Sequence, residues 1–286
     1  MSVSSGQRLT KIDPSTVELI AAVTRCAEAL SLDLVVVGAF ARDVWLLHSH
    51  GITPTRKTQD VDFAVCVSDW GEYESLRSAL LADEGFVDSA ERSHPERLIA
   101  PNGLPLDLLP FGGIAQERDN STVITWPTDG VEMNMAGFQE ALDTAAVFAV
   151  PVESGWCEFR VLTVPSLVIL KLVAWKDRQE NPVRRKHVED VYSILANFAA
   201  MFPQKVDTID DWSEMPDDEL ETAAFLLGRD IQAIASSGVL ASLSQLLEHE
   251  VTSYGRCELV RDMQRHCGGA FQKSRSLLGW LRKGLG

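Results

Sequence analysis

The stretch TQDVDFAVCV, residues 58–67, decides the fold, because it combines the pattern of a strand with two aspartates. Val and Phe favour strands, whereas Asp is among the poorest strand formers. Side chains of a strand alternate between its faces, so Asp60 and Asp62 share one face, followed by the small Ala64 and Cys66. Buried carboxylates are costly unless a positive charge meets them. The stretch therefore predicts a core strand that presents two carboxylates to a cation.

A second apolar run, PLDLLPF at residues 105–111, contains another aspartate, Asp107. An Asp-x-Asp pair alone is weak evidence of a site, since many such pairs are solvated strand ends or turns. If the run around Asp107 pairs beside the first strand, however, three carboxylates share one face. Mg²⁺ is typically held by carboxylates, water and phosphate oxygens, and three carboxylates can hold two ions about 3.5–4 Å apart. We therefore expect Asp60, Asp62 and Asp107 to be metal ligands.

The segments around these two runs predict the rest of an α/β unit. Apolar residues at helical spacing predict a helix over residues 14–30, and another that begins after a cap at Ser68 or Asp69. LDLVVVG, residues 32–38, predicts a short buried strand. The segment after it predicts a helix that stops near Gly51, where glycine can adopt the left-handed conformation of a helix cap.

Two hairpins are expected in the same unit. RLIAPNGLPLDLLPF, residues 97–111, predicts a hairpin because Asn102-Gly103 suits a tight turn between two apolar runs. Residues 145–153 and 157–164 predict the second, with Gly155 helping the chain to reverse.

From residue 165 onward the pattern is helical. It predicts helices over residues 165–179 and 186–202, and about three more after residue 218. Pro203 and the acidic stretch that follows it indicate a hinge. We expect an α/β domain of residues 1–164 and a helical C-terminal domain of residues 165–286.

Composition restricts the class of protein and its partners. The chain has 286 residues, is 45% hydrophobic and carries a net charge of −15, which disfavours indiscriminate binding to nucleic acid. Basic residues gather at 184–186 and 256–283, where a polyanion would have to bind, although solvated helix faces explain each patch taken alone. Five scattered cysteines without a CxxC pair disfavour disulfides and zinc sites. The opening lacks a signal-peptide pattern, and no apolar run would span a bilayer, so we expect a cytoplasmic protein without a membrane partner.

Five segments resemble, in their order, the nucleotidyltransferases of the DNA polymerase β superfamily. They are GAFARD (38–43), RKTQDVDFAV (56–65), PLDLLPFGGI (105–114), LKLVAWKDR (170–178) and KHVEDVYSIL (186–195). They are most similar to the AbiEii-like group, which includes toxins of bacterial toxin–antitoxin and phage-defence systems. The resemblance covers roughly residues 34–195. It implies an α+β fold class: a polymerase-β-like mixed sheet with flanking helices, followed by a helical C-terminal region.

The resemblance also implies roles for single residues. Asp60 and Asp62 match the metal-binding pair, and Asp107 matches the third carboxylate, which helps to activate the acceptor hydroxyl. Lys171 matches a lysine that contacts the triphosphate. Asp190 matches a downstream aspartate. The implied cofactor is Mg²⁺ or Mn²⁺, and the implied substrate is a nucleoside triphosphate.

Further positions would contact the nucleotide phosphates. Gly38 and Ala39 match a small-residue loop, although Ala39 departs from the family pattern because it has no hydroxyl. Arg42 could reach phosphate, or could simply be exposed. Lys176 could neutralise phosphate, or its charge could interact favourably with the helix dipole at the C-terminal end of its helix. Two more departures are the insertion HSHGITPTRK, residues 48–57, and His187, where relatives often have aspartate. Lys171 lies in an apolar run, so we expect it to be buried opposite an anion.

The resemblance leaves the acceptor open. RNA such as a tRNA 3′ end, a protein side chain and an aminoglycoside-type small molecule remain as acceptors, and a toxin would imply a cognate antitoxin. A non-catalytic nucleotide-binding regulatory protein of the same fold is the alternative from another class.

Overall fold

The computed structural model describes residues 6–54, 56, 58, 60–90, 94–118, 121–128, 130–177, 184–207, 215–252 and 256–286. The chain forms two compact units, Met1–Thr163 and Val164–Gly286. Its assignment to two functional domains, residues 1–164 and 165–286, stays a prediction.

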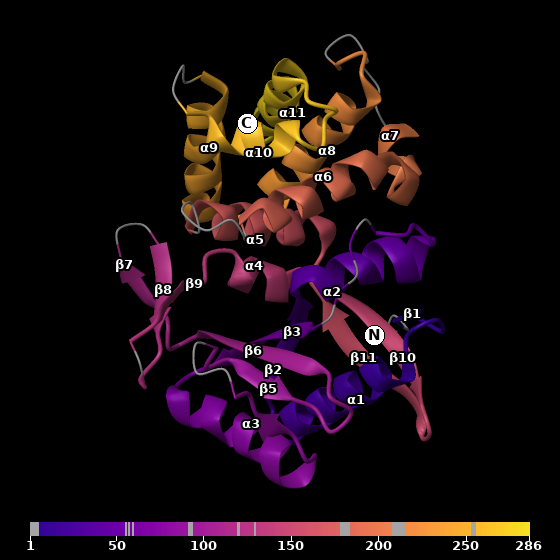
Figure 1. Ribbon diagram of the computed structural model, residues 1–286, viewed down its shortest axis with the longest axis vertical. Coiled ribbons are helices and arrows are strands. Elements are labelled where there is room, and N and C mark those ends of the chain that lie inside the picture. Colours follow the sequence, from indigo (N-terminus) through magenta and orange to yellow (C-terminus); the bar gives the residue numbers. More distant parts are fainter. Residues whose placement is uncertain are drawn as a thin grey trace. The chain divides into compact units, whose positions relative to one another are not determined.

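The first unit is built on a mixed sheet (Figure 1). The strands of this sheet are β1 (Gln7–Arg8), β2 (Asp33–Val37), β3 (Val61–Val67), β4 (Val87–Asp88), β5 (Arg97–Ile99), β6 (Pro105–Gly112), β10 (Ala146–Val152) and β11 (Gly155–Val161). Their order across the sheet is β1-β10-β11-β2-β3-β6-β5-β4. β3 pairs antiparallel with β2 and parallel with β6. Both directions occur, and the predicted mixed sheet is confirmed.

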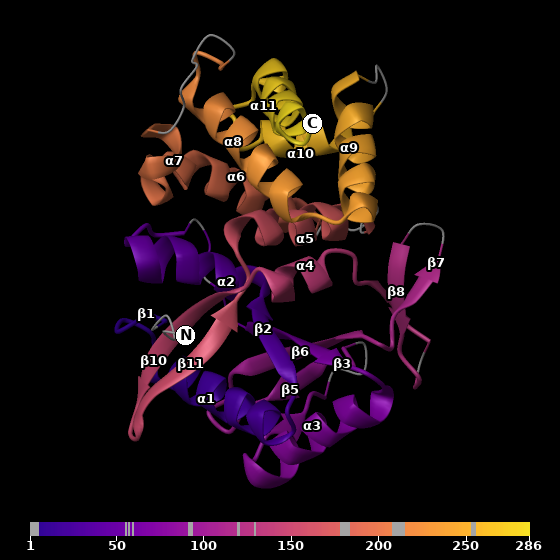
Figure 2. The ribbon, with the colours of Figure 1, turned by 180° about the vertical axis from the view of Figure 1, so that it is seen from behind.

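Helices cover both faces of this sheet. They are α1 (Pro14–Ala29), α2 (Gly38–Asp43), α3 (Trp70–Asp83) and α4 (Phe138–Asp143), and α2 continues into a π-helix, η1 (Val44–Ser49). Both views show α1 and α3 together on one face, with α2 and α4 on the other (Figures 1 and 2). The predicted flanking helices are therefore present.

A small antiparallel sheet and the helix α4 complete the unit and were not predicted. The strands of the small sheet are β7 (Gln116–Arg118), β8 (Ser121–Thr125) and β9 (Glu132–Asn134). Both hairpins were predicted correctly, because β5 pairs antiparallel with β6 and β10 pairs antiparallel with β11.

Local sequence explains the elements around β3. The valines and Phe63 on one face of β3 are buried, which is the burial expected for a core strand. The Asp69 carboxylate accepts a hydrogen bond from the Glu72 N–H at 3.0 Å and caps α3. Of the two predicted caps, Asp69 is therefore the one used.

The helix predicted between Gly38 and Gly51 is present, but its second half is a π-helix. Ser49 Oγ donates a hydrogen bond to the Val44 carbonyl, five residues back, at 2.7 Å, which suits the wider turn. Part of the expected inserted loop at residues 48–57 is consequently helical.

The second unit is helical, as predicted. Its helices are α5 (Val164–Asp177), α6 (Arg184–Met201), α7 (Pro203–Asp207), α8 (Glu219–Ile234), α9 (Ser237–Thr252), α10 (Glu258–Gln264) and α11 (Phe271–Gly284). In the described part of the chain after residue 218 there are four helices rather than about three, because Gly268 and Gly269 separate α10 from α11 with positive φ angles. Pro203, part of the predicted hinge, begins α7, and residues 208–214 lie outside the described part. Among the described residues, no helix is long and apolar enough to cross a bilayer.

Candidate active site

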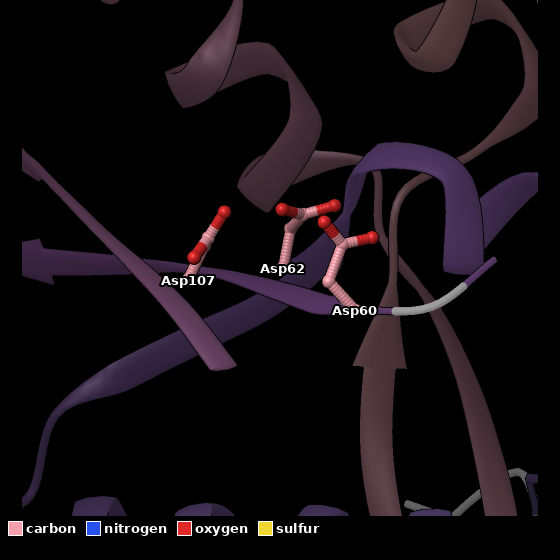
Figure 3. Close-up of side chains that lie close together, drawn as sticks. All are labelled: Asp60, Asp62 and Asp107. Atoms are coloured by element: carbon pink, nitrogen blue, oxygen red, sulfur yellow. The ribbon is translucent and has the colours of Figure 1, made fainter. Parts of the chain in front are cut away.

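Two neighbouring strands of the first unit bring together the aspartates predicted as metal ligands. Parallel pairing of β3 and β6 places Asp62 directly opposite Asp107. Asp60 immediately precedes β3, and all three side chains point to the same side of the sheet (Figure 3). One carboxylate oxygen from each lies within 4.8 Å of the others. The expected convergence of Asp60, Asp62 and Asp107 is present, whereas their roles stay predictions.

Arg97 contacts this cluster, and the sequence analysis missed it. Its Nε and Nη2 donate to Oδ1 and Oδ2 of Asp107, each at 2.7 Å. Nη2 also lies 3.5 Å from Oδ2 of Asp60. The hydrogen bonds to Asp107 raise the pKa of the Arg97 guanidinium above its ordinary value. Asp107 is only 8% exposed, so Arg97 supplies the positive partner that a buried carboxylate requires.

The hairpin loop explains why Arg97 was missed. A two-residue turn at Asn102-Gly103 would pair Arg97 with Leu108 and place its side chain on the other face. The loop instead comprises residues 101–103, because the Ala100 N–H bonds to the Leu104 carbonyl at 2.9 Å. The register therefore moves by one residue, and Arg97 lies opposite Asp107.

Gly38 makes room for Asp62. It has a φ of +72°, and a Cβ built at this position would lie 1.7 Å from Oδ2 of Asp62. Any other residue would overlap the carboxylate. Ala39, the next residue of the predicted phosphate loop, is buried at 7% exposure. A phosphate-binding role for Gly38 and Ala39 stays a prediction.

Arg42 is buried rather than exposed, which corrects one of its two predicted placements. It is 1% exposed, and its Nε lies 2.8 Å from Oδ1 of Asp43. Its Nη2 donates to the Arg56 carbonyl at 2.8 Å, and Thr58 donates its hydroxyl to Asp43 at 2.6 Å. These bonds fix the segment before Asp60 to α2. Nucleotide binding by Arg42 stays a prediction, since its guanidinium contacts protein groups.

The remaining predicted site residues belong to the second unit. Lys171 on α5 is buried, as expected, and the anion beside it is Asp190 on α6, with Nζ and Oδ2 2.6 Å apart. Asp190 has no solvent exposure. Lys176 is exposed and donates to Ser242 Oγ at 3.2 Å. The structure thus brings Lys171 and Asp190 together, and leaves Lys176 apart on the surface of its unit.

The residues of the cluster fit a hard divalent cation. Mg²⁺ and similar ions prefer oxygen ligands, and Asp60, Asp62 and Asp107 offer carboxylate oxygens only. The Asp62 carboxylate fits beside the other two because Gly38 has no side chain in the volume that it occupies.

Solved structures of nucleotidyltransferases show distant likeness to the chain. A nucleotidyltransferase-like antigen from Paracoccidioides brasiliensis is 17% identical, with a TM-score of 0.40, over 80% of this chain and 94% of that one. The antibiotic-resistance enzyme ANT(2″)-Ia with adenylyl-2″-tobramycin is 18% identical, with a TM-score of 0.37, over 68% and 93%. The Thermotoga maritima CCA-adding enzyme with tRNA is 13% identical, with a TM-score of 0.28, over 96% and 82%. At these TM-scores the likenesses carry no argument about this chain.

Sequence comparison gives a family. No curated protein matches the chain. A protein family described as "Nucleotidyl transferase AbiEii toxin, Type IV TA system" matches residues 22–253, which include the carboxylate cluster, Lys171 and Asp190. Because this match spans most of the sequence, the chain belongs to the AbiEii family of nucleotidyltransferase toxins.

Proposed function

We propose that this nucleotidyltransferase moves a nucleoside monophosphate from a nucleoside triphosphate to a macromolecular acceptor, using Asp60, Asp62 and Asp107. The observation that carries the proposal is the convergence of these carboxylates on one face of β3 and β6, in a chain of the AbiEii family. Phosphoryl-group transfer needs charge and positioning more than covalent help from the protein. A cluster of carboxylates built into a core sheet supplies both.

Asp60 and Asp62 would hold a divalent ion, and Asp107 would complete the site. When bound there, Mg²⁺ or Mn²⁺ supplies the positive charge that offsets the charges of the phosphates. Asp60 and Asp62 are half-buried and Asp107 is buried, so two of the three proposed ligands keep part of their surface in contact with solvent.

The reaction uses the same residues to orient the acceptor. An acceptor hydroxyl approaches Asp107, whose carboxylate oxygen takes its proton, and the acceptor oxygen forms a bond to the α-phosphorus. The bond between the α-phosphorus and the bridging oxygen breaks, and pyrophosphate leaves with that electron pair. Within the first unit, the backbone at Gly38 and Ala39, with Arg42, would hold the phosphates. Within the second unit, Asp190 would position Lys171 through their ion pair, and phosphate binding by Lys171 and Lys176 is proposed only from the family resemblance.

The acceptor we propose is RNA, such as tRNA, or a protein. Exposed basic residues on the second unit favour RNA; they are Arg256, Arg261, Arg265, Arg282 and Lys283. The toxin family to which the chain belongs supports a toxin role in the cytoplasm, controlled by a cognate antitoxin.

Labelled transfer tests the proposal. Purified protein is incubated with each α-³²P nucleoside triphosphate, Mg²⁺ or Mn²⁺, and cell extract or an aminoglycoside. We expect a labelled macromolecule with the wild-type protein and at least a roughly hundredfold loss with Asp62→Asn, because a metal-binding carboxylate is removed. The matched control is Asp83→Asn, an exposed aspartate at the end of α3, which should transfer normally.

Digestion of the product identifies the acceptor. Loss of label on ribonuclease treatment indicates RNA, and loss on protease treatment indicates protein. Label found only on the aminoglycoside would contradict a macromolecular acceptor. Triphosphate binding without transfer to any acceptor would instead support the non-catalytic regulatory protein.

A further inference from the structure

Arg97, Asp107 and Asp62 lie at paired positions on three adjacent strands. β5, β6 and β3 are adjacent, and the register places Arg97 opposite Asp107 and Asp107 opposite Asp62. Residues directly opposite in neighbouring strands project to the same face of a sheet. One cation and two anions are therefore aligned across three strands, with Asp60 beside them.

The guanidinium of Arg97 already uses both oxygens of Asp107. Its two hydrogen bonds are 2.7 Å each, the short, paired geometry of a strong arginine–carboxylate contact. The same Nη2 atom lies 3.5 Å from Asp60. A metal ion that joined Asp107 to Asp60 would therefore meet a positive charge already in contact with both residues.

The charges of the cluster and Arg97, taken by themselves, match a single divalent ion. Three carboxylates and one guanidinium leave two negative charges, which one divalent ion neutralises, while the neighbouring Glu96 contacts His94. A second ion would add two uncompensated positive charges close to Arg97 unless an anion came with it. A nucleoside triphosphate is such an anion, and its phosphates can also receive a guanidinium through paired hydrogen bonds.

We propose that Arg97 is a positioning residue that acts as the resident counter-ion of Asp107 and makes metal loading depend on the nucleotide. Without nucleotide, the site takes one divalent ion, on Asp60 and Asp62. The second ion binds Asp107 only when the phosphates of the nucleotide draw the guanidinium away. The inference rests on the proposed function, since it requires the carboxylates to be metal ligands.

An opposite role for Arg97 makes an opposite prediction. If Arg97 only held Asp107 in place as a metal ligand, removing it would weaken metal binding, typically by about 10–100-fold. If Arg97 competes with the ion, removing its charge strengthens binding at Asp107, by about tenfold or more for neighbouring charges at a partly exposed site.

Counting bound Mn²⁺ tests the inference. Electron paramagnetic resonance of free Mn²⁺ gives stoichiometry and affinity without any turnover. We expect one ion on the wild-type protein, and a second on Arg97→Gln, which keeps a polar side chain but not the charge. Arg97→Lys keeps the charge and should bind one ion. The double variant R97Q/D107N should return to one, which assigns the added ion to Asp107.

Counting Mn²⁺ on the wild-type protein with and without a nucleotide analogue tests the inference even if a variant fails to fold. Adding an α,β-methylene nucleoside triphosphate, which cannot lose pyrophosphate, should raise the count from one ion to two per protein, after subtraction of the Mn²⁺ that the same nucleotide binds in the absence of protein. Two ions on the wild-type protein without nucleotide would overturn the inference, as would a count or affinity for Arg97→Gln that is unchanged or lower.

The effect of Asp62→Asn separates this result from the proposed function. Mn²⁺ binding that is lost in Asp62→Asn supports the metal site whatever Arg97 does, and unchanged binding would contradict the site itself.

Discussion

At the scale of single residues, the arrangement of the carboxylate cluster depends on the absence of a Cβ atom at Gly38. Asp62 occupies the volume that a Cβ at position 38 would fill, at 1.7 Å from Oδ2. The same glycine has a φ of +72°, which L-amino acids with side chains rarely adopt. Two constraints, one from the backbone and one from the carboxylate, therefore act on this position.

Gly38→Ala should abolish the site rather than only weaken the fold. The added methyl group forces either Asp62 or the start of α2 to move. Because a displacement of about 1 Å can cost about a hundredfold in rate, we expect at least that loss of transfer, together with a loss of Mn²⁺ binding. Transfer of label and Mn²⁺ titration measure both effects.

Gly51→Ala is the matched control. Gly51 has a φ of +70°, but nothing lies within 4 Å of the Cβ position. Both variants should therefore lose about 1–2 kcal/mol of stability from the left-handed backbone, measured by urea unfolding. Only Gly38→Ala should lose Mn²⁺. Equal metal binding by the two variants would contradict the role given to Gly38.

At the scale of elements, the pair of Lys171 and Asp190 joins α5 to α6. Nζ and Oδ2 are 2.6 Å apart, and both residues are buried. A buried charge that loses its partner is strongly destabilising, whereas replacing both partners by apolar groups is often neutral. The pair is therefore a structural contact of the second unit, whatever contact Lys171 makes with a nucleotide.

Replacing one member of this pair should destabilise the protein by about 3–5 kcal/mol, because the other charge stays buried. Lys171→Met and Asp190→Leu should each show this loss in urea unfolding, and the double variant should recover most of it. Lys176→Met, on the exposed part of the same helix, should change stability by less than about 0.5 kcal/mol. A double variant as unstable as the sum of the single variants would show that the two charges do not interact.

Elements with a repeating apolar pattern were predictable, and elements without one were not. β3, β6 and both hairpins have apolar runs bounded by turn residues, which local sequence determines. The strand β7, with the sequence QER, is exposed along its whole length and has no apolar alternation, so its sequence does not reveal its pairing with β8. The helix α4 has only six residues, too few for a helical period to be visible.

The candidate site shows the same limit. Asp60, Asp62 and Asp107 could be predicted because a carboxylate is conspicuous in an apolar strand. Arg97 could not, since its position depends on a loop that is one residue longer than the turn suggested by Asn102-Gly103. Burial of Lys171 followed from its apolar neighbours, but the geometric pairing with Asp190 depends on how α5 packs against α6.

At the scale of the whole molecule, an acidic chain carries both the carboxylate cluster and a helical unit with basic patches. The net charge of −15 opposes a general attraction to nucleic acid, so an RNA acceptor would have to bind through local basic residues. Selective binding of this kind is compatible with a toxin that modifies a restricted set of targets.

If the protein is a toxin through its transferase activity, then inducing its expression in a bacterial host should arrest growth. Asp62→Asn should relieve the arrest because it removes a carboxylate of the proposed metal site, whereas Asp83→Asn should not. Colony counts after induction, with protein levels compared by immunoblotting, provide the measurement. Arrest that persists at equal levels of Asp62→Asn would mean that the toxicity does not arise from nucleotidyl transfer.

The acidic and basic residues of the site lie on strands that are supported differently within the sheet. β3 is flanked along its length by β2 and β6, whereas β5 has three residues and is followed by a terminal strand, β4, of only two. Asp62 and Asp107 are thus anchored in interior strands of the sheet, whereas Arg97 is attached near its margin, where fewer backbone hydrogen bonds resist movement. We therefore expect a rearrangement that accompanies substrate entry to begin on the strand of Arg97, while Asp62 and Asp107 keep their positions.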